Sequence, residues 1–191
     1  MSAVTDLDRP DAVTTATVRD LARQIAAEVT DPELPMLTLE DLGVLRDVEL
    51  TADGTVVASL TPTYSGCPAM AEMRADVSTR LRDAGFERVE IRTVLDPPWT
   101  TAWITRDGRR KLAEHGIAPP TTTSTAAAHA GAPTSAGPVL VQLSPTRRAP
   151  LPCPRCGSLD TEETSRFSAT ACRALWRCRS CLEPFEHVKE I

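Results

Sequence analysis

Two pairs of cysteines near the C-terminal end constrain this chain more than any other feature. Cys153 pairs with Cys156 and Cys178 with Cys181, each as C-x-x-C, and 21 residues separate the pairs. A C-x-x-C turn directs two thiolates at one metal ion, and two such turns complete the four-sulfur shell of a structural zinc site. A segment of about 40 residues buries too little apolar surface to fold without a metal ion that cross-links it. The pattern therefore predicts a zinc ribbon over residues 151–191.

Other uses of these cysteines can be weighed against zinc. Residues 1–9 lack the basic head and apolar run of a secretory signal, which indicates a cytoplasmic protein in which disulfides are rare. A redox C-x-x-C pair would accompany a βαβ pattern that we do not find here. An iron–sulfur cluster could use the same four thiolates and stays open. Four closed ligands leave no position for a substrate, so the site is interpreted as structural.

Two further residues of this segment are expected to play no part in the metal site. Cys172 lies between the two pairs and is predicted to pack in the interior of the ribbon. His187 is predicted to be an ordinary surface residue.

The distribution of charge favours protein partners. Residues 1–116 carry 13 basic and 20 acidic side chains, and residues 151–191 carry six of each sign. A nucleic-acid binder is expected to present a basic region, because neutralised phosphates supply most of its affinity. No segment is basic enough, so we expect no nucleic-acid partner. No apolar run approaches the roughly 20 residues that cross a bilayer, so we expect no membrane partner either.

The pattern of apolar residues predicts an α+β fold before the cysteine pairs. Helical spacing, an Asp-Gly turn and helix-ending glycines indicate six elements: helices over 17–30, 69–84 and 106–115, and strands over 44–50, 55–61 and 89–94. From 118 to 150, six prolines among small polar residues indicate a flexible segment. We expect a disordered N-terminus (1–16), a small two-layer helix/sheet domain (17–116), a flexible linker (117–150) and the zinc ribbon (151–191).

Cys67 is the remaining cysteine with a chemical interpretation. It precedes Pro68, and proline is favoured at the first position of a helix. Cys67 is therefore predicted to be the helix cap, with its sulfur near the positive end of the helix dipole, which favours the thiolate. On these residues alone, a small buried core cysteine is an equally good interpretation.

Four ordered motifs resemble those of the metal–sulfur cluster assembly-factor domain, which occurs in iron–sulfur targeting factors. They are DPELP at 31–35, DLG at 41–43, TPTYSGCP at 61–68 and DPPWT at 96–100. The resemblance covers residues 17–116. It implies that Cys67 handles iron or an iron–sulfur cluster, with Asp31 and Glu33 as acidic neighbours.

The ribbon sequence contains CPRCGS at 153–158, SRFSATACRALWRC at 165–178 and CLEPF at 181–185. With these stretches the whole chain resembles the family of D subunits encoded with the bacterial phenylacetyl-CoA ring epoxidase. This resemblance implies an accessory protein that assembles or delivers iron or an iron–sulfur cluster to epoxidase subunits or other iron proteins of phenylacetate degradation. A structural subunit without metal transfer is the alternative, and a homodimer stays open. No nucleotide-binding loop, histidine–carboxylate site or nucleophile triad is recognised, so we do not expect an enzyme.

Overall fold

The computed structural model describes residues 12–121 and 151–190, and the chain divides into two compact units. Unit 1 runs to His115 and also includes the final residues from Lys189, whereas unit 2 runs from Gly116 to Val188. No helix among the described residues is both long enough and apolar enough to span a membrane.

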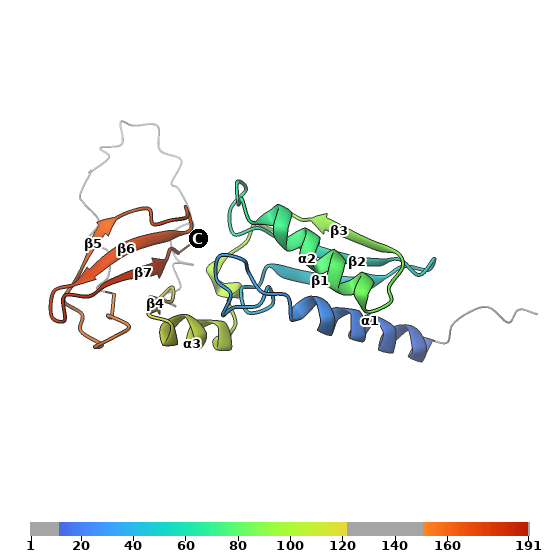
Figure 1. Ribbon diagram of the computed structural model, residues 1–191, viewed down its shortest axis with the longest axis horizontal. Helices are drawn as coiled ribbons and strands as arrows, with labels where there is room; N and C mark the ends of the chain where they lie inside the picture. The colour runs from blue at the N-terminus through green and yellow to red at the C-terminus, as the bar shows by residue number, and fades with distance from the viewer. Residues whose placement is uncertain (1–11, 122–150, 191) are drawn as a thin grey trace, which may run out of the picture. The chain divides into compact units, whose positions relative to one another are not determined.

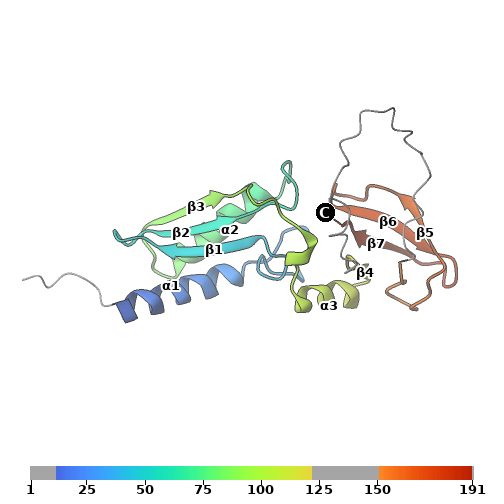
Figure 2. The same ribbon diagram turned by 180° about the vertical axis from the view of Figure 1, so that it is seen from behind.

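Unit 1 is a two-layer arrangement of helices on a sheet, as the α+β prediction requires. Its elements in chain order are α1 (Ala12–Ala27), β1 (Leu45–Leu50), β2 (Val56–Leu60), α2 (Met70–Asp83), β3 (Val89–Thr93), the 3-10 helix η1 (Thr101–Trp103) and α3 (Arg106–Glu114). The sheet order is β1-β2-β3, with β1 antiparallel and β3 parallel to β2. Figures 1 and 2 show α1 and α2 on one face of this sheet.

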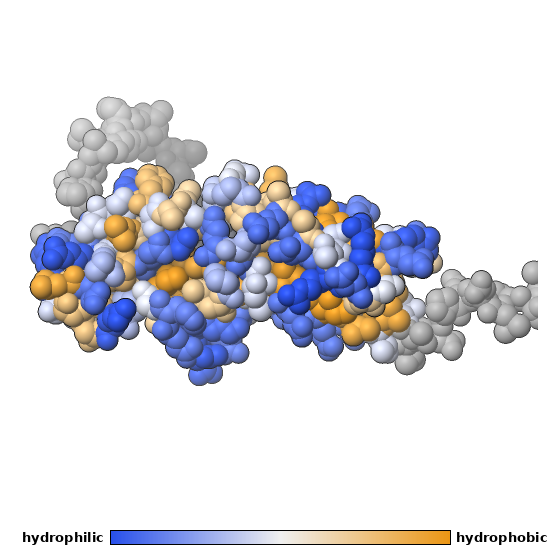
Figure 3. Space-filling model, in the orientation of Figure 1, coloured by the Kyte–Doolittle hydropathy of each residue, from blue (hydrophilic) through white to orange (hydrophobic). Residues whose placement is uncertain are grey.

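The core of unit 1 forms because side chains alternate along the strands. Val48, Ala58 and Ile91 lie side by side in the sheet, and they point to one face because a strand has a two-residue period. Helix α2 buries Met73, Val77 and Leu81, which are spaced at one turn of a helix. Helix α1 covers its face less completely: Leu21 is 50% exposed, and Figure 3 shows apolar surface over this helix.

Unit 2 is a four-stranded sheet. Its strands are β4 (Ile117–Ala118), β5 (Thr161–Ser165), β6 (Arg173–Cys178) and β7 (Pro184–Val188), in the spatial order β4-β7-β6-β5. Strands β5, β6 and β7 form an antiparallel meander, and β4 pairs in parallel with β7. The core of unit 2 is an apolar cluster: Ala118, Leu151, Cys153, Ala174, Trp176, Cys178 and Phe185.

Two predicted boundaries are corrected. Residues 12–16, expected within a disordered N-terminus, belong to α1, because this alanine- and threonine-containing stretch has no proline or glycine to stop a helix. Residues 117–118, expected in the linker, form β4, because both are apolar and become buried against β7. The rest of the expected disordered N-terminus (residues 1–11) and linker residues 122–150 lie outside the described residues.

Candidate functional site

The four cysteines of the two C-x-x-C pairs lie in turns of unit 2. Cys153 and Cys156 precede β5, Cys178 ends β6, and Cys181 lies in the turn that leads into β7. In the first turn, Gly157 adopts φ +74 and its amide donates to the Cys153 carbonyl at 2.8 Å. In the second turn, Leu182 takes φ +66, a conformation that residues other than glycine rarely adopt. The hydroxyl groups of Ser158 and Ser180 hydrogen-bond at 2.7 Å and link the turns.

The sulfur atoms have the spacing that a tetrahedral metal ion requires. Cys153 Sγ lies 3.7 Å from Cys181 Sγ, and Cys156 Sγ lies 3.6 Å from Cys178 Sγ. All four sulfurs lie within 4.8 Å of one another. A tetrahedron with zinc–sulfur bonds of about 2.3 Å has edges of about 3.8 Å. The residues therefore fit a four-thiolate metal site. Within residues 12–121 and 151–190, this is the one group of three or more histidine, cysteine or carboxylate ligands so gathered.

The local hydrogen bonds favour a metal-binding thiolate at Cys178. The backbone amide of Cys181 donates to Cys178 Sγ at 3.5 Å; this bond, with the Ser180 amide and the neighbouring thiols, outweighs burial and lowers the pKa of Cys178 to about 6. Cys153 and Cys178 are buried, whereas Cys156 and Cys181 are exposed. One edge of the site is thus anchored in the core of unit 2 and the other reaches the surface.

Cys67 lies in the loop between β2 and α2, but it is not the helix cap. Helix α2 begins at Met70 and its cap residue is Ala69, so the predicted capping by Cys67 is wrong. Pro68 and Ala69 form an extra turn in which the Met70 amide donates to the Cys67 carbonyl at 3.4 Å. Cys67 is half-buried, not in a disulfide, and three residues before the helix.

Asp31 and Glu33 lie in the segment that follows α1. Asp31 is buried, and its Oδ1 accepts the amides of Glu33 at 2.7 Å and Leu34 at 2.9 Å. This carboxylate therefore closes a turn in the DPELP motif. Glu33 is partly exposed. These two carboxylates and Cys67 are not among the metal-ligand groups formed by the described residues.

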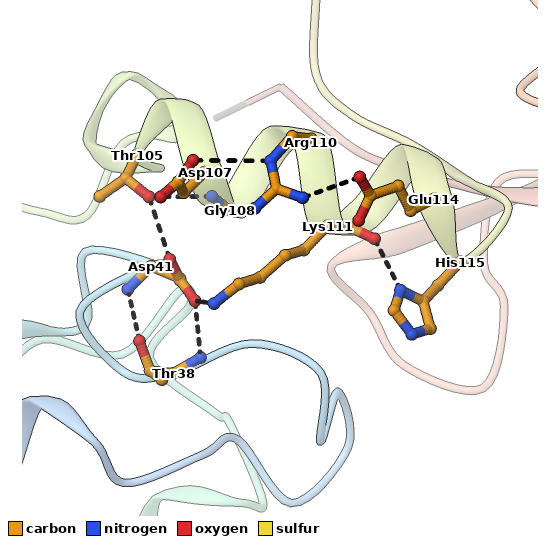
Figure 4. Close-up of polar contacts among 9 residues, drawn as sticks. All are labelled: Thr38, Asp41, Thr105, Asp107, Gly108, Arg110, Lys111, Glu114 and His115. Atoms are coloured by element: carbon orange, nitrogen blue, oxygen red, sulfur yellow. Dashed lines mark hydrogen bonds and ion pairs between the residues drawn. The ribbon is translucent and has the colours of Figure 1, made fainter.

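The DLG motif is explained by contacts that join distant segments of unit 1. Asp41 accepts the Thr38 amide at 3.1 Å, the Thr105 hydroxyl at 3.2 Å and Lys111 Nζ at 2.5 Å, as Figure 4 shows. Burial raises the pKa of Asp41, but the hydrogen bond from Lys111 and those from Thr38 outweigh it, and the net pKa lies below its usual value. Thr105 caps α3 through the Gly108 amide, so the carboxylate fixes the start of that helix.

Trp99 of the DPPWT motif is a core anchor. It is 4% exposed, and its indole N–H donates to the Leu42 carbonyl at 2.9 Å.

Trp99 also forms a wall of an open pocket of about 290 Å³, which lies where the chain leaves β2 and β3. The pocket is lined by Thr61, Pro62, Thr63, Tyr64, Ser65, Leu95, Pro98 and Trp99. Thr61 Oγ1 is buried without a hydrogen-bond partner, so the pocket wall contains one unsatisfied polar atom. The loop that carries Cys67 therefore borders a largely apolar hollow.

Comparison with known proteins assigns both parts of the chain. Residues 140–189 match the PaaD zinc beta ribbon domain, and residues 23–97 match an iron-sulfur cluster assembly protein. Over 165 residues, 86% of this chain and 88% of the relative, the sequence is 41% identical to an Escherichia coli (strain K12) protein, provisionally named as the D subunit of 1,2-phenylacetyl-CoA epoxidase. The chain belongs to this family of D subunits.

Two further relatives resemble part of the chain. An Fe-S protein maturation auxiliary factor of Porphyromonas gingivalis (strain ATCC BAA-308 / W83) is 30% identical over 97 residues, which cover 50% of this chain and 90% of that protein. A crystal structure of a domain of unknown function, DUF59, from Bacillus anthracis has a TM-score of 0.50 and 25% identity, covering 53% of this chain and 97% of that one. The structural match supports the α+β fold.

The structure also corrects the expectations for two residues of unit 2. His187, predicted on the surface, is 7% exposed, because its side chain points into unit 2, where its Nδ1 lies 3.2 Å from the Ala118 carbonyl. Cys172, predicted in the interior, is half-exposed because it lies in the turn before β6, where its sulfur contacts Thr170 Oγ1 at 3.1 Å. Neither the role of His187 nor the pocket could be read from sequence spacing, since both depend on long-range pairing.

Proposed function

We propose that this D-subunit family member is a non-catalytic accessory protein of the phenylacetyl-CoA epoxidase system, which assembles or delivers iron or an iron–sulfur cluster to its protein partners. One observation carries the proposal: a single chain joins an iron-sulfur cluster assembly match over residues 23–97 to a PaaD ribbon match over residues 140–189. The names of the relatives, an epoxidase subunit and a maturation auxiliary factor, support the same combination.

Cys67 is the residue that we assign to the transferred metal. Its sulfur is the soft ligand that iron and iron–sulfur clusters prefer, and Cys67 is half-buried in the loop whose residues 61–65 line the pocket. A single thiolate leaves most coordination positions to other ligands, so a partner protein can complete the shell and then take the metal. Asp31 shapes its own turn in the DPELP motif through two amide contacts, and Glu33 of that turn is the acidic group that we assign to iron handling.

The ribbon has a separate role in this proposal. Cys153, Cys156, Cys178 and Cys181 would hold one zinc ion, whose chemistry there is to cross-link the two turns of unit 2. Because all four positions are closed by protein, the ribbon would stabilise the fold and present a surface to epoxidase subunits. Transfer is assigned to unit 1 alone.

The test is a comparison of Cys67→Ser with Cys172→Ser in cells that carry only the variant protein. Both cysteines are half-exposed, and both changes replace sulfur by oxygen in a side chain of similar size. We expect Cys67→Ser to lower phenylacetyl-CoA epoxidation and the iron content of the partner proteins by about ten-fold or more, because oxygen is a poor ligand for soft metal centres. We expect Cys172→Ser to leave both quantities unchanged.

Folding and complex formation are the controls for this test. Circular dichroism and co-purification with epoxidase subunits should be the same for Cys67→Ser and the unmodified protein. Normal epoxidation with normal iron loading in the Cys67→Ser strain would contradict metal handling at Cys67. That result would favour a purely structural role for this family member.

A further inference from the structure

Strand β4 belongs to the sheet that carries the four-cysteine site, although it lies far from the cysteines in sequence. Ile117 pairs with Glu186 and Ala118 pairs with His187, in parallel along β7. Residues 119–150 separate this strand from Leu151, where the chain returns to the same core. The match to the PaaD ribbon begins at residue 140, so it does not include β4.

Side-chain packing ties β4 to the metal ligands. Ala118 is 1% exposed and belongs to the same apolar cluster as Cys153 and Cys178. Both of these cysteines are buried ligands of the site. A buried alanine in such a cluster leaves no space for a larger side chain without moving its neighbours.

His187 fixes the position of β4 from the β7 side. Its Nδ1 lies 3.2 Å from the Ala118 carbonyl, which can only accept, so Nδ1 carries the hydrogen. The imidazole ring stands at 88° to the Trp176 ring, with centroids 6.1 Å apart. His187 therefore connects β4 to β6, the strand that ends at Cys178.

We propose that β4 is energetically coupled to the metal centre: docking of Ile117–Ala118 on β7 and metal binding by the four cysteines stabilise each other. Ala118 and His187 are positioning residues in this proposal, since neither binds the metal. Loss of the metal releases β4, which directly follows the His115–Gly116 junction between the two units. The inference rests on the proposed metal site.

The energetic basis is reciprocal coupling. Docking β4 brings Ala118 into the same cluster as Leu151, and holding together two points far apart along a chain costs entropy. A strand of two residues makes too few contacts to meet that cost unless the rest of the sheet is already formed. The metal supplies that order by joining the two turns. If a docked β4 raises metal affinity by some factor, bound metal must raise the docking equilibrium by the same factor.

The experiment uses the full-length, zinc-loaded protein with Ala118→Asp and Ala113→Asp. Ala113 is an exposed residue of α3, so the same change five residues upstream is a matched control. Zinc transfer to the chelating dye 4-(2-pyridylazo)resorcinol is followed over time. We expect Ala118→Asp to release zinc at least about ten-fold faster, because a carboxylate cannot be buried in the apolar cluster. Ala113→Asp should release zinc at the rate of the unmodified protein.

A second variant and a second readout cover the case in which Ala118→Asp unfolds unit 2. His187→Phe keeps an aromatic ring near Trp176 but removes the donor to Ala118, and it should speed release about three-fold, the loss of one hydrogen bond. Its cobalt-loaded form should keep the absorption of a four-sulfur site. In the unmodified protein, metal removal should speed hydrogen exchange at the amides of β4.

The outcomes separate this inference from the proposed function. An unmodified protein that holds no metal would contradict the metal site itself. If the protein holds zinc, the role of β4 alone would be overturned by two results together. These are equal zinc release rates for Ala118→Asp, Ala113→Asp and His187→Phe, and unchanged hydrogen exchange at the amides of β4.

Discussion

Asp41 offers a test of the contacts made by the DLG motif, because its carboxylate joins its own turn, through Thr38, to helix α3, through Thr105 and Lys111. Burial raises the pKa of this carboxyl, but the hydrogen bonds from Lys111 and Thr38 lower the pKa by more than burial raises it. The folded-state pKa therefore lies below the ordinary value of 3.8. A lowered pKa contributes stability above pH 3.8, and the contribution is lost as the pH falls through the folded-state value.

We therefore expect Asp41→Asn to lower the free energy of unfolding by about 1 kcal/mol at pH 7, a value kept small because Lys111 is partly exposed to solvent. The difference should shrink below pH 3.8, as measured by urea unfolding at several pH values. Asp107→Asn is the control, since Asp107 is exposed and lies 3.6 Å from Arg110 (Figure 4). An equal loss at pH 3 and pH 7 would mean that the Asp41 charge does not matter.

Single residues were predictable from sequence where the signal is local. The spacing of the ribbon cysteines predicted four sulfurs around one point, and the structure brings these atoms together. The cap assigned to Cys67 was wrong because the Pro68–Ala69 turn delays the helix, which a proline rule does not anticipate. The burial of His187 depends on a partner, Ala118, that is 69 residues away.

At the scale of elements, the packing of the DLG turn against η1 explains its glycine. Gly43 has φ +68, and an added Cβ would lie 2.6 Å from Trp103 Cβ and 2.7 Å from the Trp103 carbonyl oxygen. Gly85, at the end of α2, has φ +95 with open space around it. Alanine at either position adopts a strained backbone, but only at Gly43 does it also collide with another element.

We expect Gly85→Ala to lower the free energy of unfolding by about 1 kcal/mol, the cost of a left-handed alanine. Gly43→Ala should cost about 3 kcal/mol, because steric overpacking adds to that strain. Chemical unfolding of both variants, followed by circular dichroism, gives the difference directly. Equal losses would show that η1 moves aside without cost.

The helices and strands of unit 1 were predicted from periodicity almost to the residue at α2, β1, β2, β3 and α3. These elements have clear apolar periods and glycine or Asp-Gly boundaries. Strand β4 was missed because two apolar residues carry no period, and their strand character comes entirely from pairing with β7. Because β4 belongs to the ribbon sheet, the boundary between the two units also differs from the prediction. Unit 2 begins at Gly116, before residues 117–150, which were expected to form the linker.

At the scale of the whole molecule, the two units differ in what holds them together. Unit 1 buries apolar residues from α1, α2, β1 and β2, whereas the core of unit 2 includes two of the four cysteines. A small core that contains metal ligands depends on the metal for its order. The three tryptophans report on the units separately, since Trp99 and Trp103 lie in unit 1 and Trp176 in unit 2.

Metal removal should therefore unfold unit 2 and leave unit 1 folded. We expect Cys178→Ser, or chelation of the unmodified protein, to collapse the indole N–H resonance of Trp176 while those of Trp99 and Trp103 keep their positions. Cys172→Ser is the matched control, because Cys172 lies outside the four-sulfur group and should leave all three resonances unchanged. Thermal melts should show the same separation: Cys178→Ser loses the transition of unit 2 and retains that of unit 1. Simultaneous loss of all three resonances would mean that unit 1 needs the metal-bound ribbon in order to fold. An intact Trp176 resonance in metal-free protein would mean that burial alone sustains unit 2, and that its cysteines serve a purpose other than stability.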